Sequence, residues 1–138
     1  MEETLERFLI AQNGKTIHGN TIYEQALKEI EEGKIDFECW IRYVFPQLKL
    51  SGTSKLTTFY GLNGHEEATE YINHPILRER LIRATQTILN NNKSVYEIFS
   101  PLGVMKVRAC MLLFSSVSDK SVTMFAVGNA NEPIGNGP

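Results

Sequence analysis

Several polar and aromatic side chains near the middle of the sequence have the chemistry to bind an anionic ligand that carries a ring. Trp40, Arg42 and Gln47 lie in the stretch FECWIRYVFPQLKL, and Lys106 lies in a later apolar run. An indole stacks on planar rings, while guanidinium and ammonium groups pair with phosphate oxygens. Each residue also has a structural interpretation, in which Gln47 bonds the turn after the proline and the cations extend to water. The sequence therefore offers a candidate ligand site together with a structural alternative.

The sequence contains no motif typical of a metal site or of a catalytic cysteine nucleophile. His18, His65 and His74 lack the second histidine at the spacing of a zinc-protease helix. Cys39 and Cys110 do not form a Cys-x-x-Cys pair, and both lie in apolar runs, so we expect buried, reduced and unreactive thiols. We expect no metal and no cofactor.

Length and charge restrict the class of protein. A chain of 138 residues fits one domain, and it can bury a core without disulfide bonds. The net charge of -2 gives no general attraction for phosphate backbones, so duplex nucleic acid is not an expected partner. The apolar run FLIA near the acidic N-terminus is too short for a signal sequence or a membrane span. We therefore expect a cytoplasmic protein outside the membrane, whose oligomeric state the sequence does not predict.

Local signals predict several helices. Three pairs with capping-box spacing mark expected helix starts: Thr21 with Glu24, Asn63 with Glu66, and Ser94 with Glu97. The clearest helix runs from Pro75 to about Leu89, since proline suits the first helical position. A short helix is expected around residues 5–9, and apolar residues at helical spacing mark the run 104–114.

Two segments resist assignment by periodicity. Residues 37–45 fit both helical spacing and strict alternation, and their residue types favour a strand. Asp36 and Pro46 nevertheless bound a buried helix from about Phe37 to Val44. Residues 121–127, SVTMFAV, give the weakest signal.

The order of these pieces resembles a family of small bacterial proteins called domain of unknown function 1810, some of which carry the label calpastatin. The resemblance extends from about Leu5 to Phe114, and it is most specific in FPQ at residues 45–47 and in HPxLxxRL at residues 74–81. Known members are all-helical single domains. The resemblance therefore implies an all-α, compact single-domain bundle of about seven helices over residues 1–127.

The segment that follows this domain, residues 128–138, reads GNANEPIGNGP. Its glycine, asparagine and proline content cannot bury enough apolar surface to order it, so we expect a flexible C-terminal tail.

The family has no established activity, so the resemblance implies a fold and not a function. A more distant similarity is to helical proteins that bind, or cleave the N-glycosidic bond of, ADP-ribose-type nucleotides. That similarity implies a small nucleotide-type ligand. The expected ligand-binding residues are two stacking aromatic residues and four polar ones: Trp40, Tyr60, Arg42, Gln47, Arg80 and Lys106.

The chain departs from the family pattern where catalysis would matter. Cys39 stands where the family usually has histidine, Arg42 where it has a second tryptophan, and Gly103 and Val104 where it has an acidic residue before the lysine. Histidine and aspartate are the usual proton carriers, so whether the protein is an enzyme stays open. The alternative is a non-catalytic protein–protein interaction module, in which the arginines of residues 75–89 meet an acidic partner.

Overall fold

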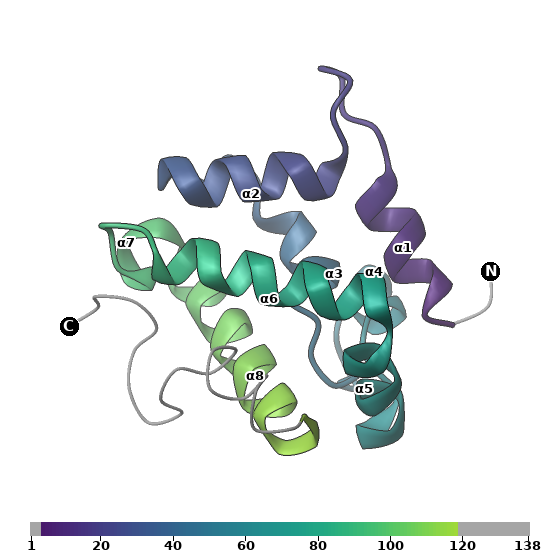
Figure 1. Ribbon diagram of the computed structural model, residues 1–138. Coiled ribbons are helices and arrows are strands. Elements are labelled where there is room, and N and C mark those ends of the chain that lie inside the picture. Colours follow the sequence, from purple (N-terminus) through teal and green to yellow (C-terminus); the bar gives the residue numbers. More distant parts are fainter. Residues whose placement is uncertain (1–3, 119–138) are drawn as a thin grey trace.

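The computed structural model describes residues 4–118, which form an all-α fold (Figure 1). In chain order the elements are α1 (Glu6–Asn13), α2 (Ile22–Glu32), the 3-10 helix η1 (Glu38–Trp40), α3 (Ile41–Val44), α4 (Lys55–Phe59), α5 (Gly64–Asn73), α6 (Pro75–Leu89), α7 (Val95–Ile98) and α8 (Pro101–Val117). These eight α-helices confirm the all-α class and are close to the predicted seven. Residues 121–127 and the predicted tail, 128–138, lie outside the described residues.

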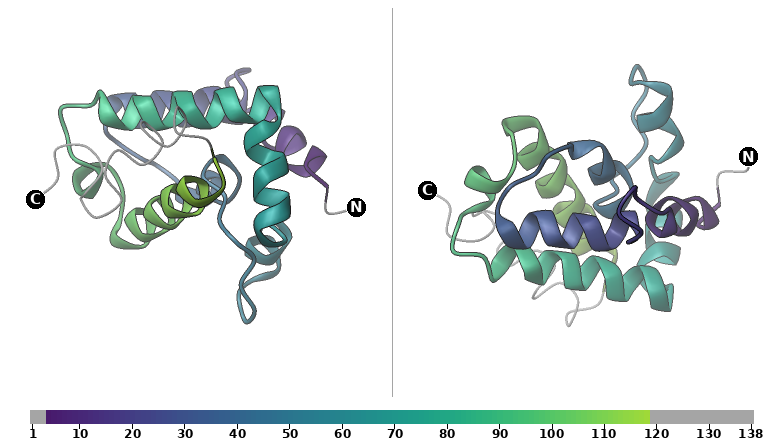
Figure 2. Two further views of the ribbon diagram at one scale, coloured as in Figure 1. Left: turned by 60° about the horizontal axis from the view of Figure 1, so that its bottom comes forward. Right: turned by 90° about the horizontal axis from the view of Figure 1, so that it is seen from above.

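The helices pack in layers around one core. α2 and α6 run side by side, as the right view of Figure 2 shows, and α8 lies below both of them in the view of Figure 1. α5 turns sharply away from α6 at His74, and it packs against α8. No helix within residues 4–118 combines the length and the apolar character that crossing a membrane requires.

The apolar stripes predicted from helical spacing face this core. Eight buried residues belong to the stripes of the two longest helices: Leu77, Leu81, Ala84 and Ile88 of α6, and Val104, Val107, Met111 and Phe114 of α8. Because each stripe lies on one side of its helix, the opposite side is left for solvent or for a site.

One of the three predicted helix starts, at Thr21, has both expected hydrogen bonds, and the start at Ser94 has one of them. Thr21 Oγ1 accepts from Glu24 N at 3.1 Å, and Glu24 Oε1 accepts from Thr21 N at 2.8 Å. Glu97 accepts from the backbone N–H of Ser94, but the buried Ser94 hydroxyl has no hydrogen-bond partner within residues 4–118.

The third predicted helix start, at Asn63, precedes α5 as expected, but the predicted hydrogen-bond partner of Asn63 is wrong. Asn63 donates its backbone N–H and its side-chain amide to Glu67, not to Glu66. An ion pair with Arg7 turns the Glu67 carboxylate inward, which places it within reach of Asn63.

The segment that fits both helix and strand is helical. η1 and α3 cover it, and Trp40, Ile41 and Val44 are buried, so the predicted buried helix is confirmed for most of its length. Phe37 is the exception, because its side chain is 76% exposed. This residue is extended, with φ of -136°, and precedes the first helical turn, so its ring lies outside the buried face.

Candidate functional site

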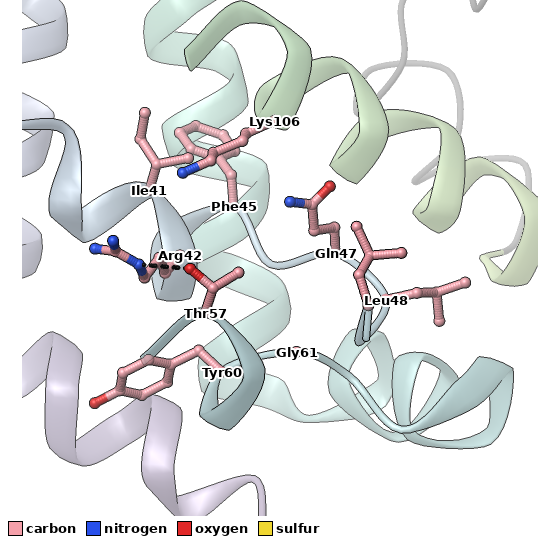
Figure 3. Close-up of a pocket in the computed structure, with 10 residues that line it drawn as sticks. Ile41, Arg42, Phe45, Gln47, Leu48, Thr57, Tyr60, Gly61 and Lys106 are labelled. Carbon is pink, nitrogen blue, oxygen red and sulfur yellow. Dashed lines mark hydrogen bonds between the residues drawn. The ribbon is translucent and has the colours of Figure 1, made fainter. Parts of the chain in front are cut away.

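A cleft opens between α8 and the loop that follows Phe45 (Figure 3). Four of the six sequence-predicted site residues line it: Arg42, Gln47, Tyr60 and Lys106. They come from α3, from the loop, from the end of α4 and from α8, so the fold brings together residues far apart in the chain. The cleft itself encloses about 20 Å³, which is room for about one water molecule.

Arg42 is held at one side of the cleft by two hydrogen bonds. Its Nε donates to Thr57 Oγ1 at 3.1 Å, and its Nη1 donates to the carbonyl oxygen of Cys39 at 3.3 Å. Ser54 Oγ donates in turn to Thr57 Oγ1. The guanidinium group is therefore positioned before any ligand arrives.

Lys106 and Gln47 enter the cleft from opposite sides, from α8 and from the loop (Figure 3). Within residues 4–118, neither side chain makes a hydrogen bond or an ion pair. The backbone of Gln47 is nevertheless fixed, because its carbonyl oxygen accepts from Leu62 N at 2.9 Å. The cleft thus presents an ammonium group and an amide on a positioned backbone.

Tyr60 contributes part of its ring. The ring lies 5.0 Å from that of Tyr43 and 4.9 Å from that of Phe59, measured between centroids, so much of its surface is packed against other aromatic residues. Burial raises the pKa of the neighbouring Tyr43 to about 12, so that phenol stays neutral at physiological pH. Tyr60 therefore lies at the edge of an aromatic cluster, and only part of its ring is available to stack on a ligand.

Two larger and mostly apolar grooves adjoin the cleft along α8. The ligand groove, of about 460 Å³, is lined by Gln47 and Lys106 together with Leu50, Thr57, Leu102 and Met105. The end groove, of about 440 Å³, lies toward the C-terminal end of α8 and is lined by Leu48, Leu50, His65, Ala109, Leu112 and Leu113. A ligand larger than a few atoms must extend from the cleft into one of these grooves.

Trp40 does not reach the cleft, which corrects the prediction that one face of its ring borders the site. The residue is 4% exposed, and its Nε1 donates to Glu29 Oε1 at 3.2 Å. Its ring lies against the rings of Phe45 and Phe99. The buried carboxylate of Glu29 orients the indole inward, so Trp40 is a core residue.

Arg80 also lies away from the cleft. Its Nη1 donates to Gln12 Oε1 at 3.0 Å, and its guanidinium lies 5.3 Å from the centroid of the Tyr23 ring. Tyr23 donates back to the carbonyl oxygen of Arg80, and burial raises the pKa of this tyrosine. Arg80 therefore connects α6 to α1 and α2, and its head group is engaged inside the fold.

Sequence reasoning missed a buried ion pair beside the cleft. Arg7 is fully enclosed and donates to Glu67, to the carbonyl oxygen of Phe59 and to that of Gly61. Glu67 lies on the apolar side of α5, four residues before the buried Tyr71. A carboxylate at that position of an apolar stripe was the signal that pointed to a buried partner.

The two cysteines differ. Cys110 is buried, and burial raises the pKa of its thiol, as expected for an inert residue. Cys39 is exposed, which corrects the prediction that both thiols are buried. Its side chain lies on the outer side of η1, opposite the inward ring of Trp40. The described residues contain no group of three or more His, Cys, Asp or Glu that could hold a metal ion.

Comparison with known proteins supports the family resemblance. The family model described as protein of unknown function, DUF1810, matches residues 2–130. The fold is similar to the crystal structure of a conserved hypothetical protein from Mycobacterium tuberculosis, with a TM-score of 0.77 and 30% sequence identity over 90% of this chain and 84% of that one. Among curated proteins none matches significantly. Because the family model matches most of the sequence, the chain belongs to the DUF1810 family.

Proposed function

We propose that this protein binds a small anionic ligand of nucleotide type at the cleft. The phosphate or other anionic group lies at the mouth of the cleft against Lys106 and Arg42, since the cleft itself holds only about one water molecule. The ring lies in the ligand groove against Leu102 and Met105. Tyr60 and Gln47 border the cleft, and Gln47 also borders the ligand groove. Trp40 and Arg80 have no part in this proposal, since Trp40 is a core residue and the head group of Arg80 is bound to Gln12 and lies over Tyr23.

The observation that carries the proposal is the state of Lys106. Its ammonium group has no acidic or hydrogen-bonding partner within residues 4–118, although it lies beside a cleft that also holds Arg42 and the amide of Gln47. Neither cation forms an ion pair within residues 4–118, and the nearby Glu38 carboxylate is engaged by Ser100, so both cations can attract an anion. A guanidinium whose orientation is already fixed also loses less side-chain entropy on binding.

The shape of the neighbouring groove supports a ligand with an apolar part. Leu102 and Met105 are 58% and 67% exposed, and they face the ligand groove beside Lys106. Covering such side chains with a planar ring removes apolar surface from water, while the hydroxyls of Thr53 and Thr57 on the other wall can bond polar edges.

The proposal is limited to binding. Besides the phenol of Tyr60, the polar side chains of the cleft are the cations Arg42 and Lys106, the amide of Gln47 and the hydroxyl of Thr57, which hold anions and orient rings. Cleavage of an N-glycosidic bond needs a group that moves a proton or stabilises positive charge on the sugar. Binding is therefore the function that this set of side chains supports.

Titration calorimetry with AMP, ADP-ribose and inorganic phosphate tests the proposal. We expect saturable binding of AMP or ADP-ribose, weaker binding of phosphate alone, and a loss of at least about tenfold in affinity for Lys106→Gln, equivalent to about 1.4 kcal/mol. The matched control is Lys28→Gln, which removes an exposed lysine from α2 and should leave affinity unchanged. Absence of binding for all three compounds, or equal affinities for the two variants, would reject the proposal.

A further inference from the structure

Within residues 4–118, an apolar groove lies beside the end of α8. α8 ends at Val117, and Ser118 leaves it in an extended conformation, with φ of -99° and ψ of 162°. The end groove lies directly beside these last turns, because Leu112, Leu113 and Ser116 form one of its walls. Leu112 and Leu50 are 48% and 54% exposed there.

The sequence that follows contains a matching apolar run. Residues 122–127, VTMFAV, come after the polar residues 118–121 and before the polar stretch 128–133. The DUF1810 family model matches to residue 130, so this run belongs to the part of the chain that the family shares. An apolar run and an apolar groove that both remain in water are an unfavourable combination.

We propose that residues 121–127 of this chain fill the end groove. The reach is short: three extended residues after Ser118 span about 10 Å, and Leu112 lies about 9 Å back along the helix axis. So short a connection keeps the local concentration of the segment high, which favours this occupant over a second copy of the chain or a separate protein.

The proposal assigns different occupants to the two grooves. Met105 belongs to the ligand groove, whereas Leu112, two turns later on α8, belongs to the end groove. The segment should therefore cover Leu112 and leave Met105 accessible. This inference stands apart from the nucleotide proposal, because it can hold whether or not a nucleotide binds.

Thiol alkylation of the full-length chain tests this difference. Cys39→Ser removes the exposed native thiol, and Cys110 is buried. In that background Leu112→Cys and Met105→Cys place one thiol in each groove. With iodoacetamide, and with each rate divided by its rate in urea, we expect Leu112→Cys to react at least about tenfold more slowly than Met105→Cys.

A change in the segment itself identifies the occupant. Phe125→Asp places a charge in the apolar run, and it should bring the Leu112→Cys rate close to that of Met105→Cys. Equal rates without Phe125→Asp would overturn the proposal. A slow Leu112→Cys alkylation rate that Phe125→Asp does not change would also overturn the proposal. If that rate then rose when the protein was diluted, the groove would be assigned to a second copy of the chain. Because no nucleotide is present, none of these outcomes bears on the proposed ligand.

Discussion

Arg7 Nη2 lies 2.8 Å from Glu67 Oε1, and this buried ion pair joins the first helix to α5 across 60 residues of sequence. The Arg7 guanidinium also donates to carbonyl oxygens of Phe59 and Gly61, which lie on either side of Tyr60. Arg7 therefore holds the segment that carries one wall of the cleft, although it does not line the cleft itself.

We predict that Arg7→Met lowers the free energy of unfolding by about 3 to 5 kcal/mol, since it leaves a buried carboxylate and carbonyl groups without their donor. Urea denaturation followed by circular dichroism measures the change. Arg83→Met is the matched control, because Arg83 is exposed on α6, and its effect should stay within about 0.5 kcal/mol. Equal stabilities of the two variants would show that the Arg7 pair contributes little.

The same pair should give the fold an acid-sensitive contribution. Burial raises the pKa of Glu67, but hydrogen bonds from Arg7 and Asn63 and the charge of Arg7 lower it more, so the net pKa lies below the usual value. A carboxylate with a depressed folded-state pKa stabilises the fold above its unfolded pKa of about 4.3, and this contribution is lost as the pH falls through the folded pKa.

We therefore predict that Glu67→Gln has a lower free energy of unfolding than the parent protein at pH 7. This difference should become smaller as the pH falls below about 4. Unfolding free energies measured at a series of pH values test this. Glu66→Gln changes an exposed carboxylate one residue away, so its unfolding free energy should depend on pH in the same way as that of the parent. If the difference in unfolding free energy between the parent and Glu67→Gln stayed constant until the protein unfolded in acid, the ion pair would not be the source of the acid sensitivity.

Local signals predicted several helix boundaries, although α4 was not predicted and α8 extends three residues beyond each end of the predicted run 104–114. Pro75 starts α6 and Leu89 ends it as expected, and Thr21 with Glu24 caps α2, because these signals depend on residues within one helical turn. The Asn63 start was assigned to the wrong carboxylate, since the choice between Glu66 and Glu67 depends on Arg7, far away in sequence.

The direction of side chains was harder to predict than the helices. Residues 38–44 are helical as the resemblance implied, yet the sequence did not show that Trp40 faces Glu29 while Phe37 and Cys39 face solvent. A short 3-10 turn followed by one α turn has no sustained period, so spacing cannot assign its faces. The cleft was predicted in part, through Arg42, Gln47, Tyr60 and Lys106.

The two thiols should react differently. Cys39 is exposed, whereas Cys110 is buried with a raised pKa. We predict that Ellman's reagent modifies one thiol rapidly in the native protein and reaches the second only on unfolding. In Cys39→Ser the fast reaction should vanish. Rapid modification of both thiols in the parent would place Cys110 near the surface.

Trp40 should be essential for stability. Its ring packs against Phe45 and Phe99 and its Nε1 donates to the buried Glu29, so Trp40→Ala should cost roughly 3 to 5 kcal/mol of unfolding free energy. Phe37→Ala is the control, because that ring is exposed and its removal should change stability little. A Trp40→Ala protein that unfolds at the same urea concentration as the parent would refute the core position.

Substitution of Gln47 distinguishes a structural role of its side chain from a role in ligand binding. Its backbone carbonyl is held by Leu62 N, but within residues 4–118 its side-chain amide bonds nothing and points into the cleft (Figure 3). Gln47→Ala should therefore change the free energy of unfolding by less than about 0.5 kcal/mol, because no buried hydrogen bond is lost. Its affinity for AMP should still fall by about three- to tenfold, the cost of one hydrogen bond of about 1 kcal/mol. A loss of 1 to 3 kcal/mol in stability with unchanged AMP affinity would instead assign Gln47 to the fold.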